Sequence, residues 1–267
     1  MSTLHPTRPP AGRGSTEGRG VLRLSWLHTR SLFVETVRVP IAVVGTVVFP
    51  ALTLLFFVVP QPFAQDPAQA TAAAAQISLF AVVSVCLFTY GVGVAEDRAL
   101  PYDSYLRTLP VGAAPRLAGR VLNGLGFALV ALVPVVVLAT LLTAATLPAS
   151  RLLLTGGALA LAALPMLGLG LAIGYGLPTK AALAVAQLLL LPLAFGGGLF
   201  LPPETFPSWL DALSTWLPTR AGRDLVVSAA TGVDLPVTAL PVLAGWVLLT
   251  AALAVLAYRR DEGRRFR

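Results

Sequence analysis

The chain has 267 residues, of which 56% are hydrophobic and 12% are charged, and its mean hydropathy is +0.81. This composition is too apolar for an ordinary soluble domain. The 19 Lys and Arg residues outnumber the 12 Asp and Glu residues, but they flank apolar runs and do not alternate with aromatic residues, which argues against nucleic-acid binding.

Residues 1–20 are rich in Pro, Gly, Ser and Arg, show no apolar period, and are predicted to form a disordered cytoplasmic tail. Residues 20–38 have an apolar face and a basic face, which is typical of a helix lying in the membrane interface. The alternative is a plain cytoplasmic extension of the first membrane span. The residues that define the interfacial helix are Leu22, Arg23, Trp26, Arg30 and Phe33.

Six apolar runs are long enough, or nearly so, to cross a bilayer, which requires about 20 residues. Each run is nearly free of charge, as expected when a charge at the centre of a span costs about 2.5–3.5 kcal/mol on insertion scales. The predicted fold class is an all-α membrane protein in which residues 21–258 form a single six-span domain. The spans are expected at about 39–60, 71–94, 121–147, 152–176, 181–201 and 237–258.

The distribution of cations predicts the orientation of these spans. If both termini are cytoplasmic, 16 of the 19 Lys and Arg residues lie on the inner side, including those of a basic tail at 259–267. Cytoplasmic loops carry an excess of Lys and Arg, so the sequence favours a multi-pass protein of the plasma membrane with both termini inside.

A polar island at 95–120 separates the second and third apolar runs. A short helix is predicted for Tyr102–Leu109, with a turn at Pro110 that ends it. On the cytoplasmic side, such an island is where a soluble partner would push; the alternative is that its charges only satisfy the positive-inside rule. The candidate contact residues are Glu96, Arg98, Tyr102, Tyr105, Leu106, Arg107, Leu109 and Pro110.

The segment between the fifth and sixth runs, 202–236, is partly apolar. Apolar residues from Trp209 onward share one helical face, and Pro207 suits the first turn of a helix. Short helices at the outer leaflet are predicted, with a solvated loop as the alternative. The motif residues are Pro202, Glu204, Pro207 and Trp209.

Sequence motifs for catalysis and cofactor binding are missing. The single lysine, Lys180, lies in GYGLPTKA and does not form a P-loop, so no ATP site is expected on this chain. The two histidines, His5 and His28, do not have the spacing of metal ligands, and Cys86 is the single cysteine. The chain is therefore predicted not to be an enzyme and to bind no cofactor itself.

Polar residues inside the predicted spans are neutral. The absence of intramembrane charge argues against ion-coupled transport and favours a pathway for an amphiphile with energy supplied elsewhere. Hydrogen bonding between helices is the alternative role for these residues. The candidate pathway residues are Gln76, Ser84, Thr89, Asn123 and Gln187.

Together these features resemble the permease subunit of type-2 ABC exporters, a family that includes drug- and antibiotic-resistance transporters. The resemblance lies in the six-span plan with an amphipathic helix before it and in the segment after the second span. It also lies in the Pro202 to Leu210 pattern and in Arg223-Asp224-Leu225. Leu217-Pro218 departs from the Asn-Pro usual in the family.

The resemblance implies that two permease subunits, identical or paralogous, form the pathway in the lipid membrane. A separate nucleotide-binding ATPase would bind ATP and Mg, and the coupling helix around Tyr102–Leu109 would dock on it. The expected function is outward movement of an amphiphilic drug, antibiotic or lipid-like substrate. An ion-coupled transporter and a non-transporting scaffold remain as alternatives. The excess of arginine over lysine is typical of a GC-rich bacterial genome.

Overall fold

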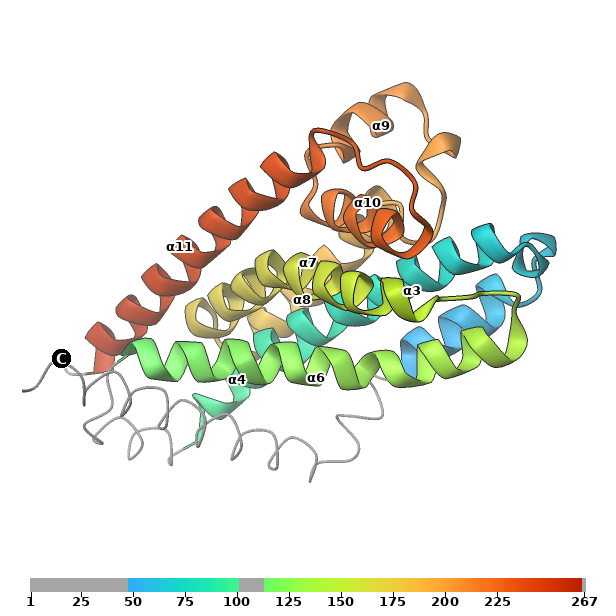
Figure 1. Cartoon of the computed structure of the whole chain (residues 1–267). Helices are drawn as coiled ribbons and strands as arrows, with labels where there is room; N and C mark the ends of the chain where they lie inside the picture. Colours follow the sequence, from blue (N-terminus) through green and yellow to red (C-terminus); the bar gives the residue numbers. More distant parts are fainter. Residues whose placement is uncertain (1–47, 101–112, 266–267) are drawn as a thin grey trace, which may run out of the picture.

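The structure, a computed structural model, describes residues 48–100 and 113–265, and this part of the chain is helical without strands (Figure 1). Several predicted features lie outside the described residues. They are the disordered tail, the interfacial helix with Leu22, Arg23, Trp26, Arg30 and Phe33, the start of the first span, and the coupling residues Tyr102, Tyr105, Leu106, Arg107, Leu109 and Pro110.

A tight connection joins the first described helix to the second. The first helix, Val48–Val58, ends in the π-helical segment η1 (Leu54–Val58) and is followed by the 3-10 turn η2 (Pro62–Gln65). α3 (Pro67–Leu87) then begins with proline at its first position, and the Asp66 carboxylate accepts a hydrogen bond of 2.8 Å from the Gln69 backbone N–H. Proline and an acidic cap are both favoured at a helix start, so the local sequence determines where α3 begins.

α3 is the central helix of the bundle. It continues through the π-helical segment η3 (Phe88–Val92) into α4 (Gly93–Asp97), forming one rod of 31 residues. In the most apolar 18-residue stretch of this rod 83% of the residues are buried, whereas 22% are buried in the corresponding stretch of α11 (Ala239–Arg265). A helix apolar on all sides is stable where other helices surround it, as they do here.

Five helices in the described part of the chain are long and apolar enough to cross a membrane. Besides the α3–α4 rod and α11, these are α6 (Ala113–Leu142), α7 (Ala149–Gly176) and α8 (Thr179–Gly196). The first predicted span is described only from residue 48 onward, so the count of six spans stays a prediction.

The helices alternate in direction, so the bundle has two distinct ends (Figure 1). α4, the end of α7, the start of α6 and the C-terminal end of α11 share one end. The start of α3 and the α6–α7 connection lie at the other, where the Thr71 hydroxyl accepts a 3.0 Å hydrogen bond from the Thr146 backbone N–H. α9 (Ser208–Ser214) and α10 (Pro218–Thr231) precede α11, and α10 packs on α3 and α7.

Two helices end earlier than their apolar runs suggest. α8 ends at Gly196, whereas the run extends to Leu201, because Gly198 has a φ of +73° that only glycine adopts without strain. α6 ends at Leu142, since Ala144 turns away to donate a 2.8 Å backbone hydrogen bond to Ala64. In both places the backbone, through its conformation at α8 and a hydrogen bond at α6, determines where the helix ends.

α7 approaches the α3–η3 rod closely at two glycines. A Cβ atom at Gly170 would collide with the Cys86 carbonyl oxygen, and one at Gly174 would collide with the Gly91 carbonyl oxygen. Small residues let the backbones of neighbouring membrane helices touch, so this crossing depends on glycine.

Candidate functional site

Arg98 ties together three helices at the end of the bundle next to the predicted coupling segment. Its guanidinium donates hydrogen bonds to the Gly174 and Leu177 carbonyl oxygens at the end of α7 and forms an ion pair with Asp261 on α11. The two side chains are only 14% and 5% exposed. A buried carboxylate needs such a partner, because removing a charge from water without compensation is costly.

A second set of contacts extends this cluster to α6. Arg120 forms an ion pair with Asp97 at 3.3 Å, and the guanidinium carbons of Arg98 and Arg120 lie 5.9 and 5.7 Å from the centre of the Tyr175 ring. A cation over an aromatic face is electrostatically favourable. Tyr175 in turn packs edge-on against Tyr258 at 4.9 Å. The cluster therefore joins α4, α6, α7 and α11.

The two predicted contact residues that the structure describes have different surroundings. Glu96 is exposed, whereas Arg98 faces inward toward α7 and α11. Nearby, the Thr179 hydroxyl at the start of α8 donates a 3.2 Å hydrogen bond to the Ala95 carbonyl oxygen. The end of α4 therefore contacts the end of α7, the start of α8 and α11.

Sequence reasoning missed Asp261. It lies in the segment 259–267, which the sequence predicts to be a basic cytoplasmic tail, and it is 163 residues from Arg98. A carboxylate within the arginine-rich stretch RRDEGRR was the available signal. Its partner could not be identified from spacing.

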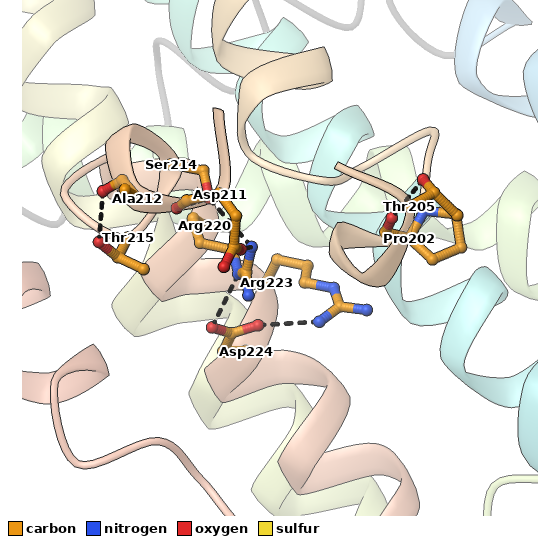
Figure 2. A network of polar contacts seen from close by, with 9 residues as sticks. All are labelled: Pro202, Thr205, Asp211, Ala212, Ser214, Thr215, Arg220, Arg223 and Asp224. Carbon is orange, nitrogen blue, oxygen red and sulfur yellow. Dashed lines mark hydrogen bonds and ion pairs between the residues drawn. The ribbon is translucent and has the colours of Figure 1, made fainter. Parts of the chain in front are cut away.

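A second polar cluster lies toward the opposite end of the bundle, in α9 and α10 (Figure 2). Arg220 contacts Asp224 at 3.1 Å, Asp211 at 3.3 Å and the Ser214 hydroxyl at 3.0 Å. Arg223 contacts the other oxygen of Asp224 at 2.9 Å. The two arginines and two aspartates balance in charge and hold α9 against α10.

The predicted motif after the fifth span lies beside this cluster. Pro202, Glu204, Pro207 and Trp209 are all exposed, and Pro207 is the residue immediately before α9. Helices do form in this segment, but its placement outside the membrane stays a prediction.

The five candidate pathway residues do not form one continuous surface. Gln76 is 8% exposed, and with its amide oxygen toward Arg223 it accepts hydrogen bonds of 2.9 and 3.2 Å from that guanidinium. The Ser84 hydroxyl donates a hydrogen bond to the Phe80 carbonyl oxygen of its own helix, and Thr89 is half-buried. Asn123 is buried beside Tyr90, whereas Gln187 is exposed on α8. Since Gln76 and Tyr90 are 14 residues apart on one rod, Gln76 and Asn123 are separated by about 21 Å along the bundle.

Fold and clusters together define the class of the protein: a multi-pass helical membrane protein with ion-pair clusters toward both ends of its bundle. In the described residues no group of three or more His, Cys, Asp or Glu side chains is placed to hold a metal ion.

Comparison with known families identifies the class more closely. Residues 24–230 match the family described as ABC-2 type transporter. Because this match covers well over half of the chain, the protein belongs to that family.

One relative extends the comparison to an individual protein. The chain is 22% identical over 143 residues to "Putative transport permease YvfS" of Bacillus subtilis (strain 168). The match covers 54% of this chain and 58% of the relative.

Proposed function

We propose that the chain is the permease subunit of an ATP-driven exporter, powered by a separate ATPase that binds ATP and Mg. Membership of the ABC-2 type transporter family supports this assignment. The observation that carries it is the Arg98 cluster, which connects the segment expected to meet the ATPase with α6, α7 and α11.

In this proposal the coupling segment transmits the movement of the ATPase to the membrane helices. The ATPase presses on the apolar residues of Tyr102–Leu109, and the exposed Glu96 adds a polar contact at the rim. Arg98 then acts as a positioning residue, because its bonds to α7 and α11 pass the displacement into the membrane helices. A second permease copy, identical or paralogous, completes the pathway.

Copurification tests the ATPase partner directly. The full-length protein is solubilised from native membranes and captured by an affinity tag, and a nucleotide-binding ATPase is expected to follow it. Replacing Tyr105 or Arg107 by Glu is expected to abolish the association while leaving membrane insertion intact, since each places a charge where an apolar or basic contact is proposed. Retention of the ATPase by both variants would contradict the proposed docking site.

Flux measurements test the direction and the energy source. We expect ATP-dependent movement of an amphiphilic drug, antibiotic or lipid-like substrate away from the ATPase side, in a plasma-membrane protein with cytoplasmic termini. Transport driven by a proton or sodium gradient without ATP would favour an ion-coupled transporter. Tight ATPase binding without any flux would favour a scaffold.

A further inference from the structure

A cavity of about 520 Å³ lies where α3 begins, α8 has ended and α10 passes. Its apolar wall comes from the first described helix, from η2 and from residues 199–202, with Phe57 and Phe63 among the lining residues. The Phe200 ring that contributes to this wall packs against Phe80 at 4.7 Å and Phe195 at 4.9 Å. The volume falls within the range of about 300–1,000 Å³ that accommodates drug-sized ligands.

The polar groups of the cavity converge from four segments, one of which is the connection before η2 that carries Gln61. Gln69 and Gln76 come from α3, Arg223 from α10 and Glu204 from η4 (Pro203–Thr205). Gln76 holds the Arg223 guanidinium through bonds of 2.9 and 3.2 Å, and Asp224 holds it from the far side at 2.9 Å. The guanidinium is thus fixed in position at the cavity, which lowers the entropy cost of binding a ligand there.

The charges indicate what kind of ligand the cavity accepts. Of the described residues that line the cavity, Arg223 carries a positive charge and the exposed Glu204 a negative charge, while Asp224 contacts Arg223 from outside the lining. A purely anionic ligand would be repelled by Glu204 and a purely cationic one by Arg223. A headgroup with both charges satisfies both residues, and the three amides at Gln61, Gln69 and Gln76 supply further donors and acceptors.

We infer that this cavity binds an amphiphile with a zwitterionic headgroup, its apolar body lying against the phenylalanine wall. Arg223 receives the anionic part of the headgroup and Glu204 the cationic part. This inference rests on the proposed transport of amphiphiles and names the site and charge class of that ligand. A transported amphiphile and a zwitterionic membrane lipid share this chemistry.

Photolabelling of the full-length protein in uncharged maltoside detergent tests the site. The probes are lysophosphatidylcholine and lysophosphatidylglycerol with the same diazirine-bearing acyl chain, and labelled peptides are identified by mass spectrometry. The zwitterionic probe is expected to label the cavity walls, at 57–77 and 199–202, more strongly than the anionic probe.

Variants of the two charged residues make the test specific. Arg223→Gln is expected to reduce zwitterionic labelling about tenfold, because a hydrogen bond to a charged group is lost. Arg223 also contacts Asp224, so this variant is paired with Glu204→Gln, which alters an exposed side chain. Glu204→Gln is expected to lower the preference for the zwitterionic over the anionic probe about two- to fivefold.

Arg151→Gln is the matched control, because it makes the same charge change at the same end of the bundle but does not line the cavity. Unchanged labelling of this control supports the site. The inference would be overturned if both probes labelled the cavity walls equally and Glu204→Gln did not change this ratio. It would also be overturned if labelling were spread evenly over α6 and α11.

Competition with the zwitterionic, sterol-based detergent CHAPS separates the two ligand sources. Displacement by CHAPS would support a site open to amphiphiles other than lipids, and displacement only by lysophosphatidylcholine would support a lipid site. The assay contains neither ATPase nor nucleotide. A negative result therefore leaves the proposed ATP-driven transport standing, and failure of ATPase copurification leaves the site standing.

Discussion

At the scale of single residues, the most consequential interaction is the ion pair between Arg98 and Asp261. Both side chains are largely buried, and Arg98 also bonds to two carbonyl oxygens at the end of α7. A buried pair contributes little net stability compared with an apolar pair, but removing one partner leaves a charge in a poor environment. The main effect of the pair is therefore to specify how α4, α7 and α11 pack against one another.

Replacing Arg98 by Gln is expected to lower the free energy of unfolding by about 3 kcal/mol, since Asp261 loses its cation. Titration of the detergent-solubilised protein with sodium dodecyl sulfate measures the change. The double variant with Asp261→Asn is expected to recover most of the loss. Arg259→Gln, an exposed arginine at the same end of α11, is the control, and an equal loss there would show that net charge alone matters.

At the scale of elements, the crossing of α7 over the α3–η3 rod sets the spacing of the bundle centre. Gly170 and Gly174 are the points of closest approach, and the facing atoms are backbone carbonyl oxygens, which cannot move aside as a flexible side chain could. Gly157, on the same helix, faces open space where the methyl group of an alanine would lie. Comparing alanine substitutions at Gly170 and at Gly157 therefore distinguishes the effect of helix packing on stability from the effect of helix propensity.

Gly170→Ala is expected to destabilise the protein by about 1–3 kcal/mol, because its methyl group would force α7 away from Cys86. Gly157→Ala is expected to be neutral or to stabilise by up to about 1 kcal/mol, since alanine is the better helix former. Thermal unfolding in detergent compares the two variants. A loss of the same size at Gly157 would contradict the close-packing explanation.

At the scale of the whole molecule, the two ends of the bundle differ in kind. One end carries the Arg98 cluster and precedes the predicted coupling segment in the chain. The other carries the connection between α6 and α7, and the cavity lies near the start of α3. This asymmetry is consistent with the proposed transport, in which the ATPase docks at one end and the ligand binds near the other.

Cysteine accessibility tests the predicted orientation of these ends. In a Cys86→Ala background, Ser208→Cys is expected to react with a membrane-impermeant maleimide in intact cells. Arg260→Cys is expected to react only after lysis, because the arginine-rich C-terminal end is predicted to be cytoplasmic. The cysteine-free background is the control, and the reverse pattern would place the termini outside.

Several features of this protein followed from the sequence alone. Helix type and membrane residence depend on composition over about 20 residues, so the apolar runs predicted an all-helical membrane protein. The arrangement of the apolar runs, taken together with the motifs after the second and fifth runs, indicated the family that the comparison shows.

The tertiary structure decided which polar residues meet. Asp261 reaches Arg98 across 163 residues, and Gln76 meets Arg223 rather than the other candidate pathway residues. Neither contact can be predicted from the spacing of residues in the sequence, because contacts between helices depend on crossing angles and on the rotation of each helix about its axis. Hydropathy likewise cannot report a backbone hydrogen bond or a turn that ends a helix inside an apolar run, as happens at the ends of α6 and α8. Local chemistry therefore determined the class of the protein, and long-range packing determined its sites.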